Sequence, residues 1–466
     1  MTMNNTIQSL LAFLDASPVS FLAVAAMEER LAAAGFRRLD PADPMPALAA
    51  GDAFYVTKND SSLYAFRLGR RALADAGFRL ICAHCDSPTF RIKPNPEMRR
   101  AGVVQLNVEA YGGAILSTWF DRPLSLAGRV LLRTADPLRP ATRLLHVRRP
   151  LLQIPNLAIH FNRQVNDGVR LSRQKDMIPV LALDGAADDG QLAEAATRAA
   201  LPPSVLLGLI AAELGVPAAD VLDFDLYLYD TTPACLWGLH GEFISAGRLD
   251  DLSMVHAGLE ALVAAPAADV TQVLAVFDNE ETGSATKQGA ASPFLRSLLE
   301  RLVAMQMAHL VADGLQPPTA LAQTAAFLVA DGLHRAVERA FMISADNAHA
   351  LHPNYVEKYD PTNQPTVGDG PVVKYNAAQK YASDADSAAV FRALCQRAGV
   401  PCQTFVNHGD VAGGSTLGNI LTASLPLRGV DMGAPIWAMH SCRESGAVSD
   451  HLATIRVFTE FYGLEA

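Results

Sequence analysis

Four apolar, strand-like runs in this chain each lead directly into histidine or carboxylate side chains. The runs and the residues that follow them are Phe78–Ala83 with His84 and Asp86, Gln272–Phe277 with Glu280 and Glu281, Phe341–Ile343 with Asp346, and Ile436–Met439 with His440. In open α/β sheets, ligands bind at the carboxyl ends of the strands. We therefore expect these side chains to meet at one edge of a sheet.

These residue types suit a pair of divalent metal ions. Zinc accepts imidazole nitrogen and carboxylate oxygen, and two histidines with three carboxylates supply two three-ligand sites if one carboxylate bridges. Two such ions lower the pKa of a shared water and stabilise the oxyanion that forms when the water attacks. The pattern predicts a hydrolase that uses two metal ions to activate water. Manganese and cobalt suit the same ligands as zinc, so the native metal stays open.

The neighbouring Glu280 and Glu281 offer two separate roles. On an extended segment adjacent side chains point in opposite directions, so one glutamate can bind metal while the other takes the proton from water. Asp86 lies two residues after His84 and is expected to orient that imidazole. His-x-Asp pairs and acidic turns are each common in proteins, and it is their combination after four apolar runs that favours a metal site.

The composition limits the class of protein. A chain of 466 residues that is 50% hydrophobic can bury a large core, and its formal net charge of -10 makes nucleic acid and anionic membranes poor partners. Six cysteines are too few for a disulfide scaffold of this length, and Cys82 and Cys85 lie in an apolar run, so we expect buried free thiols. The first basic residue is Arg30 and no signal segment is visible, so we expect a cytoplasmic protein.

Three stretches of different texture divide the chain. Residues 1–94 and 234–466 alternate strand-like runs, such as Ser62–Arg67, with helical segments, which is typical of a mostly parallel sheet flanked by helices. Residues 95–233 contain short β-rich pieces such as Leu124–Leu132, and a loop leading into a helix is expected over residues 184–200. The sequence thus predicts an α/β fold with an inserted β-rich domain over residues 95–233.

Five motifs together resemble the signature series of the aspartyl aminopeptidase family, whose members are cytosolic or vacuolar enzymes with co-catalytic zinc. The motifs are His84-Cys85-Asp86-Ser87-Pro88, Arg248-Leu249-Asp250-Asp251, Asp278-Asn279-Glu280-Glu281-Thr282-Gly283-Ser284, Asp346-Asn347-Ala348-His349-Ala350-Leu351-His352-Pro353-Asn354-Tyr355 and His440-Ser441-Cys442-Arg443-Glu444. They stand in the family's order and spacing, and the likeness covers nearly the whole chain.

The resemblance implies a role for each residue of the metal site. The implied ligands are His84, Asp250 and Asp346 for one metal, and Asp250, Glu281 and His440 for the other. Asp250, which the apolar pattern does not single out, would then bridge the two ions. Glu280 would be the general base that deprotonates the bridging water and later protonates the leaving amine.

The resemblance also implies substrate contacts. His160 is similar to a family histidine that reaches a neighbouring subunit's active site and steadies the oxyanion. His349 is similar to a substrate-contacting residue, and Lys374 and Tyr381 look like the groups that recognise an acidic first side chain, since a partly desolvated ammonium favours a carboxylate. The implied substrates are peptides with N-terminal Asp, and then Glu.

The family's architecture is a zinc-peptidase domain interrupted by a β-rich dimerisation domain, with dimers assembling into a homo-oligomeric dodecamer. Cys85 and Thr282 depart from the residues usual in the family, and the Gly-rich segment of residues 408–416 is only loosely similar. No departure touches an implied metal ligand. Two alternatives remain from the residues themselves: an aminopeptidase or deacylase of the same two-metal class with neutral-residue specificity, and a metal-stabilised assembly protein without activity.

Overall fold

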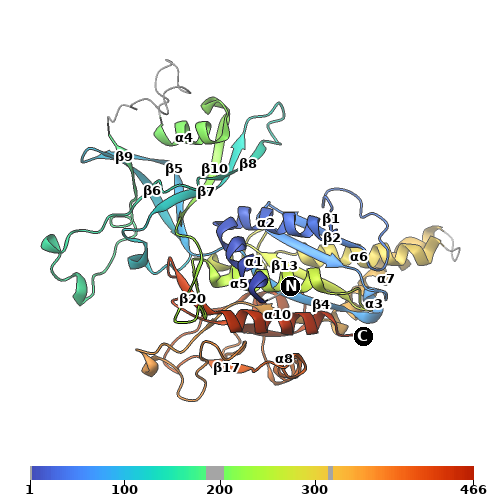
Figure 1. The fold of residues 1–466 in the computed structure, drawn as a ribbon. Coiled ribbons are helices and arrows are strands. Elements are labelled where there is room, and N and C mark those ends of the chain that lie inside the picture. The colour runs from blue at the N-terminus through green and yellow to red at the C-terminus, as the bar shows by residue number, and fades with distance from the viewer. Residues whose placement is uncertain (1–2, 185–203, 313–317, 466) are drawn as a thin grey trace. The chain divides into compact units, whose positions relative to one another are not determined.

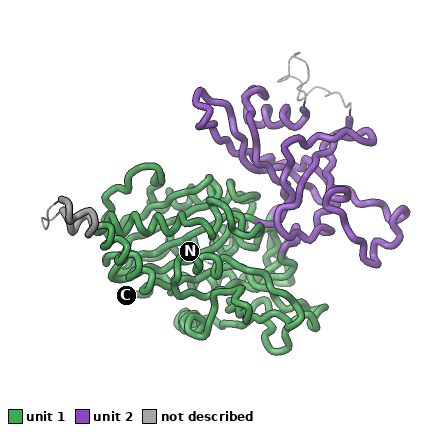
Figure 2. The backbone as a smooth tube through the Cα atoms, turned by 180° about the vertical axis from the view of Figure 1, so that it is seen from behind, with its two compact units in different colours: residues 1–86, 234–439, 444–466 green, residues 87–233, 440–443 purple. Residues whose placement is uncertain are grey.

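The computed structural model describes residues 3–184, 204–312 and 318–465 (Figure 1). The loop and helix expected over residues 184–200 lie outside them, apart from Asp184. The chain forms two compact units, coloured separately in Figure 2: unit 1 comprises Met1–Asp86, Ala234–Met439 and Glu444–Ala466, and unit 2 comprises Ser87–Pro233 and His440–Arg443.

Unit 1 is built on a nine-stranded sheet with the order β1-β2-β3-β13-β4-β14-β18-β16-β17. The strands are β1 Arg37–Arg38, β2 Ala53–Lys58, β3 Ser62–Arg67, β4 Phe78–His84, β13 Thr271–Phe277, β14 Phe341–Ala345, β16 Val372–Tyr375, β17 Gln403–Val406 and β18 Arg428–Gly433. Five of the eight neighbouring pairs are parallel, and the pairs β2–β3, β3–β13 and β16–β18 are antiparallel. The predicted mostly parallel sheet is confirmed.

Both faces of this sheet are buried, which explains why its central strands are continuously apolar. Along β4, Leu80 and Cys82 pack into one hydrophobic core, whereas Ile81 and Ala83 pack into another on the opposite face. The helices that contribute to the core of Ile81 are α1 Met3–Ala16, α2 Ser20–Ala33, α5 Leu249–Ala264, α8 Ala385–Ala398 and α10 Val448–Tyr462. Those that contribute to the core of Leu80 are α3 Leu73–Ala76, α6 Phe294–Ala312, α7 Pro318–Arg339 and α9 Leu417–Thr422.

A second sheet of unit 1 has five strands in the order β11-β12-β20-β19-β15. The strands are β11 Cys235–Trp237, β12 Phe243–Ala246, β15 Ala348–His349, β19 Pro435–Trp437 and β20 Glu444–Ala447. Residues 436–437 of the apolar run before His440 lie in β19, so this run belongs to the smaller sheet. The expectation that all four runs end at one edge of a single sheet is wrong for this run.

Unit 2 contains a six-stranded, wholly antiparallel sheet with the order β8-β7-β10-β5-β6-β9. The strands are β5 Thr89–Arg100, β6 Val103–Tyr111, β7 Leu124–Leu132, β8 Ala141–His146, β9 Val180–Leu183 and β10 Val221–Asp230, and helix α4 Val205–Leu214 packs into the same core. The predicted division after residue 94 falls inside β5. The use of this unit for dimerisation stays a prediction.

No described helix of the chain combines the length and apolar character needed to span a bilayer.

A candidate metal centre at the end of the main sheet

Three neighbouring strands of the nine-stranded sheet carry the candidate residues at the same end. Strand β4 lies between β13 and β14 and is parallel to both, and His84, its last residue, is in register with Phe277 at the end of β13. The two glutamates follow β13, and Asp346 directly follows β14. The topology thus brings residues separated by more than 250 positions to one edge.

His84 lies in a compact group with three aspartates. The ligand atoms of His84, Asp250, Asp251 and Asp346 all lie within 4.8 Å of one another, and all four residues are buried. His84 Nε2 is 3.4 Å from Asp250 Oδ1, and the backbone N–H of His84 donates to Asp251 Oδ2 at 3.1 Å. Asp251 belongs to this group, although its only predicted feature was its place beside Asp250 in the second motif.

The His84 ring is oriented by Asp86. Its Nδ1 lies 3.0 Å from the carbonyl oxygen of Asp86 and 3.4 Å from Asp86 Oδ1. A carbonyl oxygen can only accept, so Nδ1 carries the hydrogen in the neutral imidazole. The lone pair is then on Nε2, which faces the aspartates and is able to bind a metal.

Glu280 and Glu281 stand on a tight turn and not on an extended segment. Glu280–Thr282 form a 3₁₀ turn that follows Asn279, whose φ of 64° is left-handed. Consequently the two side chains converge: their carboxylate oxygens and a ring nitrogen of His84 all lie within 4.8 Å of one another. The prediction that the neighbouring glutamates point in opposite directions is wrong, because it assumed β geometry.

The Asp86 carboxylate fixes this turn as well as the imidazole. The backbone N–H of Glu280 donates to Asp86 Oδ1, and that of Glu281 donates to Asp86 Oδ2, each at 3.1 Å. Asp86 is 4% exposed, so these charge-assisted hydrogen bonds lie away from bulk water. One buried carboxylate therefore connects the ends of β4 and β13.

The clustered carboxylates of this group favour a bound cation. Burial raises the pKa of Asp251, Asp346 and Glu281 above the usual carboxyl range, and neighbouring carboxylates add to the effect. Burial also raises the pKa of Glu280, to about 8. Burial acts to lower the pKa of His84, but hydrogen bonds and attraction from its acidic neighbours outweigh burial and hold that pKa well above its usual value.

The side chains present fit a divalent metal. Asp251 Oδ1 is buried and has no hydrogen-bond partner among the described residues, although such oxygens are normally paired. One imidazole and several carboxylates within a few ångströms form a donor set of the kind that zinc accepts. A bound dication would compensate the carboxylates that burial otherwise disfavours in their charged form.

Lys374 is a cation beside this group. Its Nζ donates to the carbonyl oxygen of Asp346 at 2.8 Å, lies 3.4 Å from Asp346 Oδ1, and stands 5.4 Å from the ring centre of Tyr381. Burial acts to lower the pKa of Lys374, but Asp346 and other acidic neighbours hold it above its usual value. Lys374 and Tyr381 are 3% and 5% exposed, so they form the inner wall of the site and are not surface groups.

The remaining three predicted histidines are divided between the two units. His349, in β15 of unit 1, is exposed, and its ring centre is 5.6 Å from that of Phe405. His160 belongs to unit 2, where it is exposed in the 3₁₀ turn Ile159–Phe161. His440 also belongs to unit 2, with Nδ1 3.2 Å from the carbonyl oxygen of Gly113. The role of His440 as a metal ligand stays a prediction.

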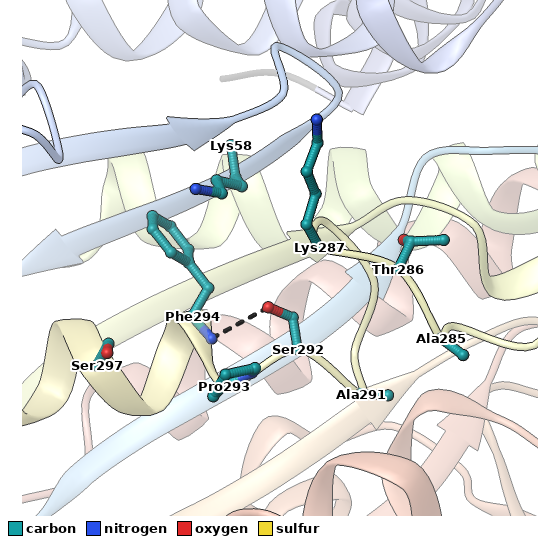
Figure 3. Close-up of a pocket in the computed structure, with 9 residues that line it drawn as sticks. All are labelled: Lys58, Ala285, Thr286, Lys287, Ala291, Ser292, Pro293, Phe294 and Ser297. Carbon is teal, nitrogen blue, oxygen red and sulfur yellow. Dashed lines mark hydrogen bonds between the residues drawn. The ribbon is translucent and has the colours of Figure 1, made fainter.

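A separate hollow of about 660 Å³ is formed partly by residues that follow the glutamates in sequence (Figure 3). Its lining includes Lys58, Thr286, Lys287 and Phe294. It offers no carboxylate or imidazole and contains none of the predicted site residues, so it is distinct from the metal centre. It is nevertheless connected to the turn that carries Glu280 and Glu281, because Thr286 Oγ1 donates to Asn279 Oδ1 at 2.9 Å.

Known proteins resemble this chain over nearly its whole length. A family model described as aminopeptidase I zinc metalloprotease (M18) matches residues 13–462. A probable M18 family aminopeptidase 2 from Clostridium acetobutylicum is 45% identical over 458 residues, which are 98% of this chain and 98% of that protein. A protein of the same name from Pseudomonas aeruginosa is 44% identical over 457 residues, covering 98% of this chain and 97% of its own.

Solved structures resemble the whole chain. A chain from the cryo-EM structure of the Ape4 and Nbr1 complex superposes with a TM-score of 0.88 at 32% identity, covering 99% of this chain and 86% of that one. The structure of Chaetomium thermophilum mApe1 gives a TM-score of 0.83 at 28% identity, covering 99% of this chain and 98% of that one.

Proposed function

This chain belongs to the M18 family of zinc metalloproteases and is an aminopeptidase of that family, and we propose that it removes an N-terminal Asp, and less readily Glu, from peptides with the help of two metal ions. The observation that carries the proposal is the buried group of His84, Asp250, Asp251 and Asp346 beside Glu280 and Glu281. A purely structural acidic cluster has no need of so many unneutralised carboxylates away from water.

The proposed ligands are divided between two ions. His84, Asp250 and Asp346 would hold one, and Asp250, Glu281 and His440 the other. When bound, the ions lower the pKa of water and polarise the peptide carbonyl. The chain's own contribution is to present Nε2 of His84 and the carboxylates in fixed directions, which the contacts of Asp86 with His84 and with the glutamate turn support.

Glu280 is the proposed general base. Its carboxylate takes a proton from the attacking water and returns it to the leaving amine. In the absence of a cation, burial raises the pKa of this carboxyl to about 8, so most of it would be protonated at neutral pH. A bound cation would lower that pKa and keep Glu280 ionised before the water attacks.

Lys374 and Tyr381 are the proposed source of acidic specificity. An ammonium held charged in a buried wall favours a carboxylate partner over a neutral side chain. Lys374 also bonds to the backbone of Asp346, so its removal would affect the metal ligand as well as the substrate pocket. Comparing Asp-, Glu- and Leu-substrates separates these effects, because only the pocket effect is selective for the acidic substrates.

The remaining part of the proposal is that the chain assembles into homo-oligomers in which His160 completes the site of a neighbouring subunit. His349 is proposed to contact the substrate. The large apolar side chains next to His160 support assembly, because Ile159 and Phe161 are 52% and 82% exposed.

A substrate panel tests the proposed specificity. The metal-loaded protein is assayed on chromogenic peptides with N-terminal Asp, Glu and Leu, with a chelator control. We expect cleavage of the Asp substrate to be fastest and to be abolished by chelation. A preference for Leu would contradict the acidic pocket, and activity that survives complete metal removal would contradict the metal mechanism.

A further inference from the structure

Glu444 closes the last of the five motifs and has no part in the proposed mechanism. It is the first residue of β20 and is 1% exposed. Its Oε2 accepts a hydrogen bond from the backbone N–H of Asp250 at 3.0 Å. We propose that Glu444 is a positioning residue that holds Asp250 in the orientation needed for metal binding. This inference rests on the proposed role of Asp250 as the ligand shared by two ions.

The topology brings Glu444 to this place. Strand β20 pairs with β12, and Glu444 lies opposite Ala246, the last residue of β12. The chain then turns through Gly247 and Arg248 and reaches Asp250 within four residues of Ala246. The strand pair therefore delivers the acceptor and the ligand to the same point.

Asp250 needs an external acceptor because its backbone is not helical. Its φ and ψ are -79° and 107°, at the start of α5, and Arg248 before it is left-handed with φ 63°. N–H groups at the start of a helix have no partner within the helix. The Glu444 carboxylate supplies one, in a place that water does not reach.

The same turn is fixed from its other side. The Arg248 guanidinium donates to the carbonyl oxygens of Ser17 and Leu14 at 3.1 and 3.2 Å, near the end of α1. After the turn, Asp251 accepts the N–H of His84. With Arg248 and Asp251 both anchored, Glu444 fixes the residue between them, whose carboxylate is 3.4 Å from the His84 ring.

Two substitutions separate the hydrogen bond from the charge. Glu444→Ala removes both, whereas Glu444→Gln removes the charge and keeps a carbonyl oxygen that can accept the Asp250 N–H. If positioning is the role, the glutamine variant rescues metal binding. If Glu444 acts only as a further negative charge near the cations, glutamine is as poor as alanine.

A matched control is Asp450→Ala. Asp450 is also a 1% exposed carboxylate of unit 1, and it accepts backbone N–H groups from Gly368 and Gly370 at 2.7 and 2.8 Å. It is not part of the His84 group. Asp450→Ala should lower the stability of the chain without lowering its metal affinity. This variant therefore measures the effect of removing a buried carboxylate that is not near the metal centre.

The experiment measures zinc affinity of the full chain by competition with a fluorescent chelator, after metal removal, together with the thermal unfolding of each metal-free variant. Outer partners of metal ligands change metal affinity by about 10–100-fold, and we expect that loss for Glu444→Ala, with Glu444→Gln within about threefold of the unmodified chain. Asp450→Ala should bind zinc normally.

Asp250→Asn separates failure of this inference from failure of the proposed function. If that variant binds zinc normally, the proposed ligand set is wrong. If Asp250→Asn loses zinc, the proposed ligand set stands. In that case the positioning role of Glu444 is overturned by either of two results: Glu444→Ala binds zinc normally, or Glu444→Gln binds zinc as weakly as Glu444→Ala. If Glu444→Ala does not fold, the comparison of Glu444→Gln with the unmodified chain decides, since positioning requires near-normal affinity there.

Discussion

Replacing Asp86 with alanine is expected to release the turn that carries Glu280 and Glu281. The two N–H groups of that turn, each 3.1 Å from an oxygen of Asp86, would lose their acceptor, and the His84 ring would lose a neighbouring carboxylate. The metal-free chain should therefore lose stability and the metal-loaded chain should lose turnover.

The size of the effect follows from these contacts. A hydrogen bond to a charged group contributes about 1.5–3 kcal/mol, and two such bonds set an upper range of about 3–6 kcal/mol. Glu280 and Glu281 are only partly buried, so water can solvate the released N–H groups in part. We expect a loss of about 2–4 kcal/mol in the free energy of unfolding, and a loss of about 10–100-fold in turnover or zinc affinity.

The assay compares Asp86→Ala with Asp86→Asn in denaturant unfolding of the metal-free chain and in turnover of an Asp-substrate at saturating zinc. Asparagine keeps one acceptor oxygen but turns an amide N–H₂ toward the second backbone donor, so it should rescue less than half of the loss. Turnover within threefold of normal in Asp86→Ala, with unchanged unfolding, would refute the assignment of Asp86 as the link between β4 and β13.

Three further changes test the site and the pH dependence of stability. Glu280→Gln should keep zinc content normal, measured by elemental analysis, and lower turnover by about 10²–10⁴-fold; near-normal turnover would remove Glu280 as the base. Lys374→Met should reduce kcat/KM for Asp-substrates more than for Leu-substrates, whereas the control Lys380→Met, at an exposed position, should leave both unchanged. An equal loss on both substrates would mean that Lys374 acts only by holding Asp346 and does not select acidic substrates. Burial lowers the pKa of His451 to about 4. Between about pH 6.5 and 4 this imidazole is therefore protonated in the unfolded chain but neutral in the folded chain. The free energy of unfolding should fall as the pH drops through this range. His451→Gln should remove about 3 kcal/mol of that acid sensitivity in unfolding titrations, whereas exposed His334→Gln should leave it intact.

Buried strands were the most predictable part of the fold. The predicted runs Ser62–Arg67 and Leu124–Leu132 have the bounds of β3 and β7, because side chains that pack into a core leave an apolar signature. Strand β5 is different, since it runs through Pro94 and Pro96, which read as breakers. Its pairing with β6 shifts register between Ile92 and Glu97, and this irregularity accommodates the prolines.

Only those site residues that directly follow an apolar strand could be predicted from the sequence pattern. His84 and Asp346 stand at the ends of apolar strands, so their positions follow from the sheet. Asp250 stands at the start of a helix after a short strand of another sheet, and only the family resemblance singled it out. The convergence of Glu280 and Glu281 depends on the left-handed backbone of Asn279. The spacing of apolar residues gives no information about this backbone conformation.

Anomalous diffraction at the zinc absorption edge, on crystals of the metal-loaded chain, tests the central claim most directly. The account predicts two zinc peaks per chain, one bound by His84, Asp250 and Asp346, the other by Asp250, Glu281 and His440. A single peak, or zinc bound away from His84 and Asp250, would contradict it.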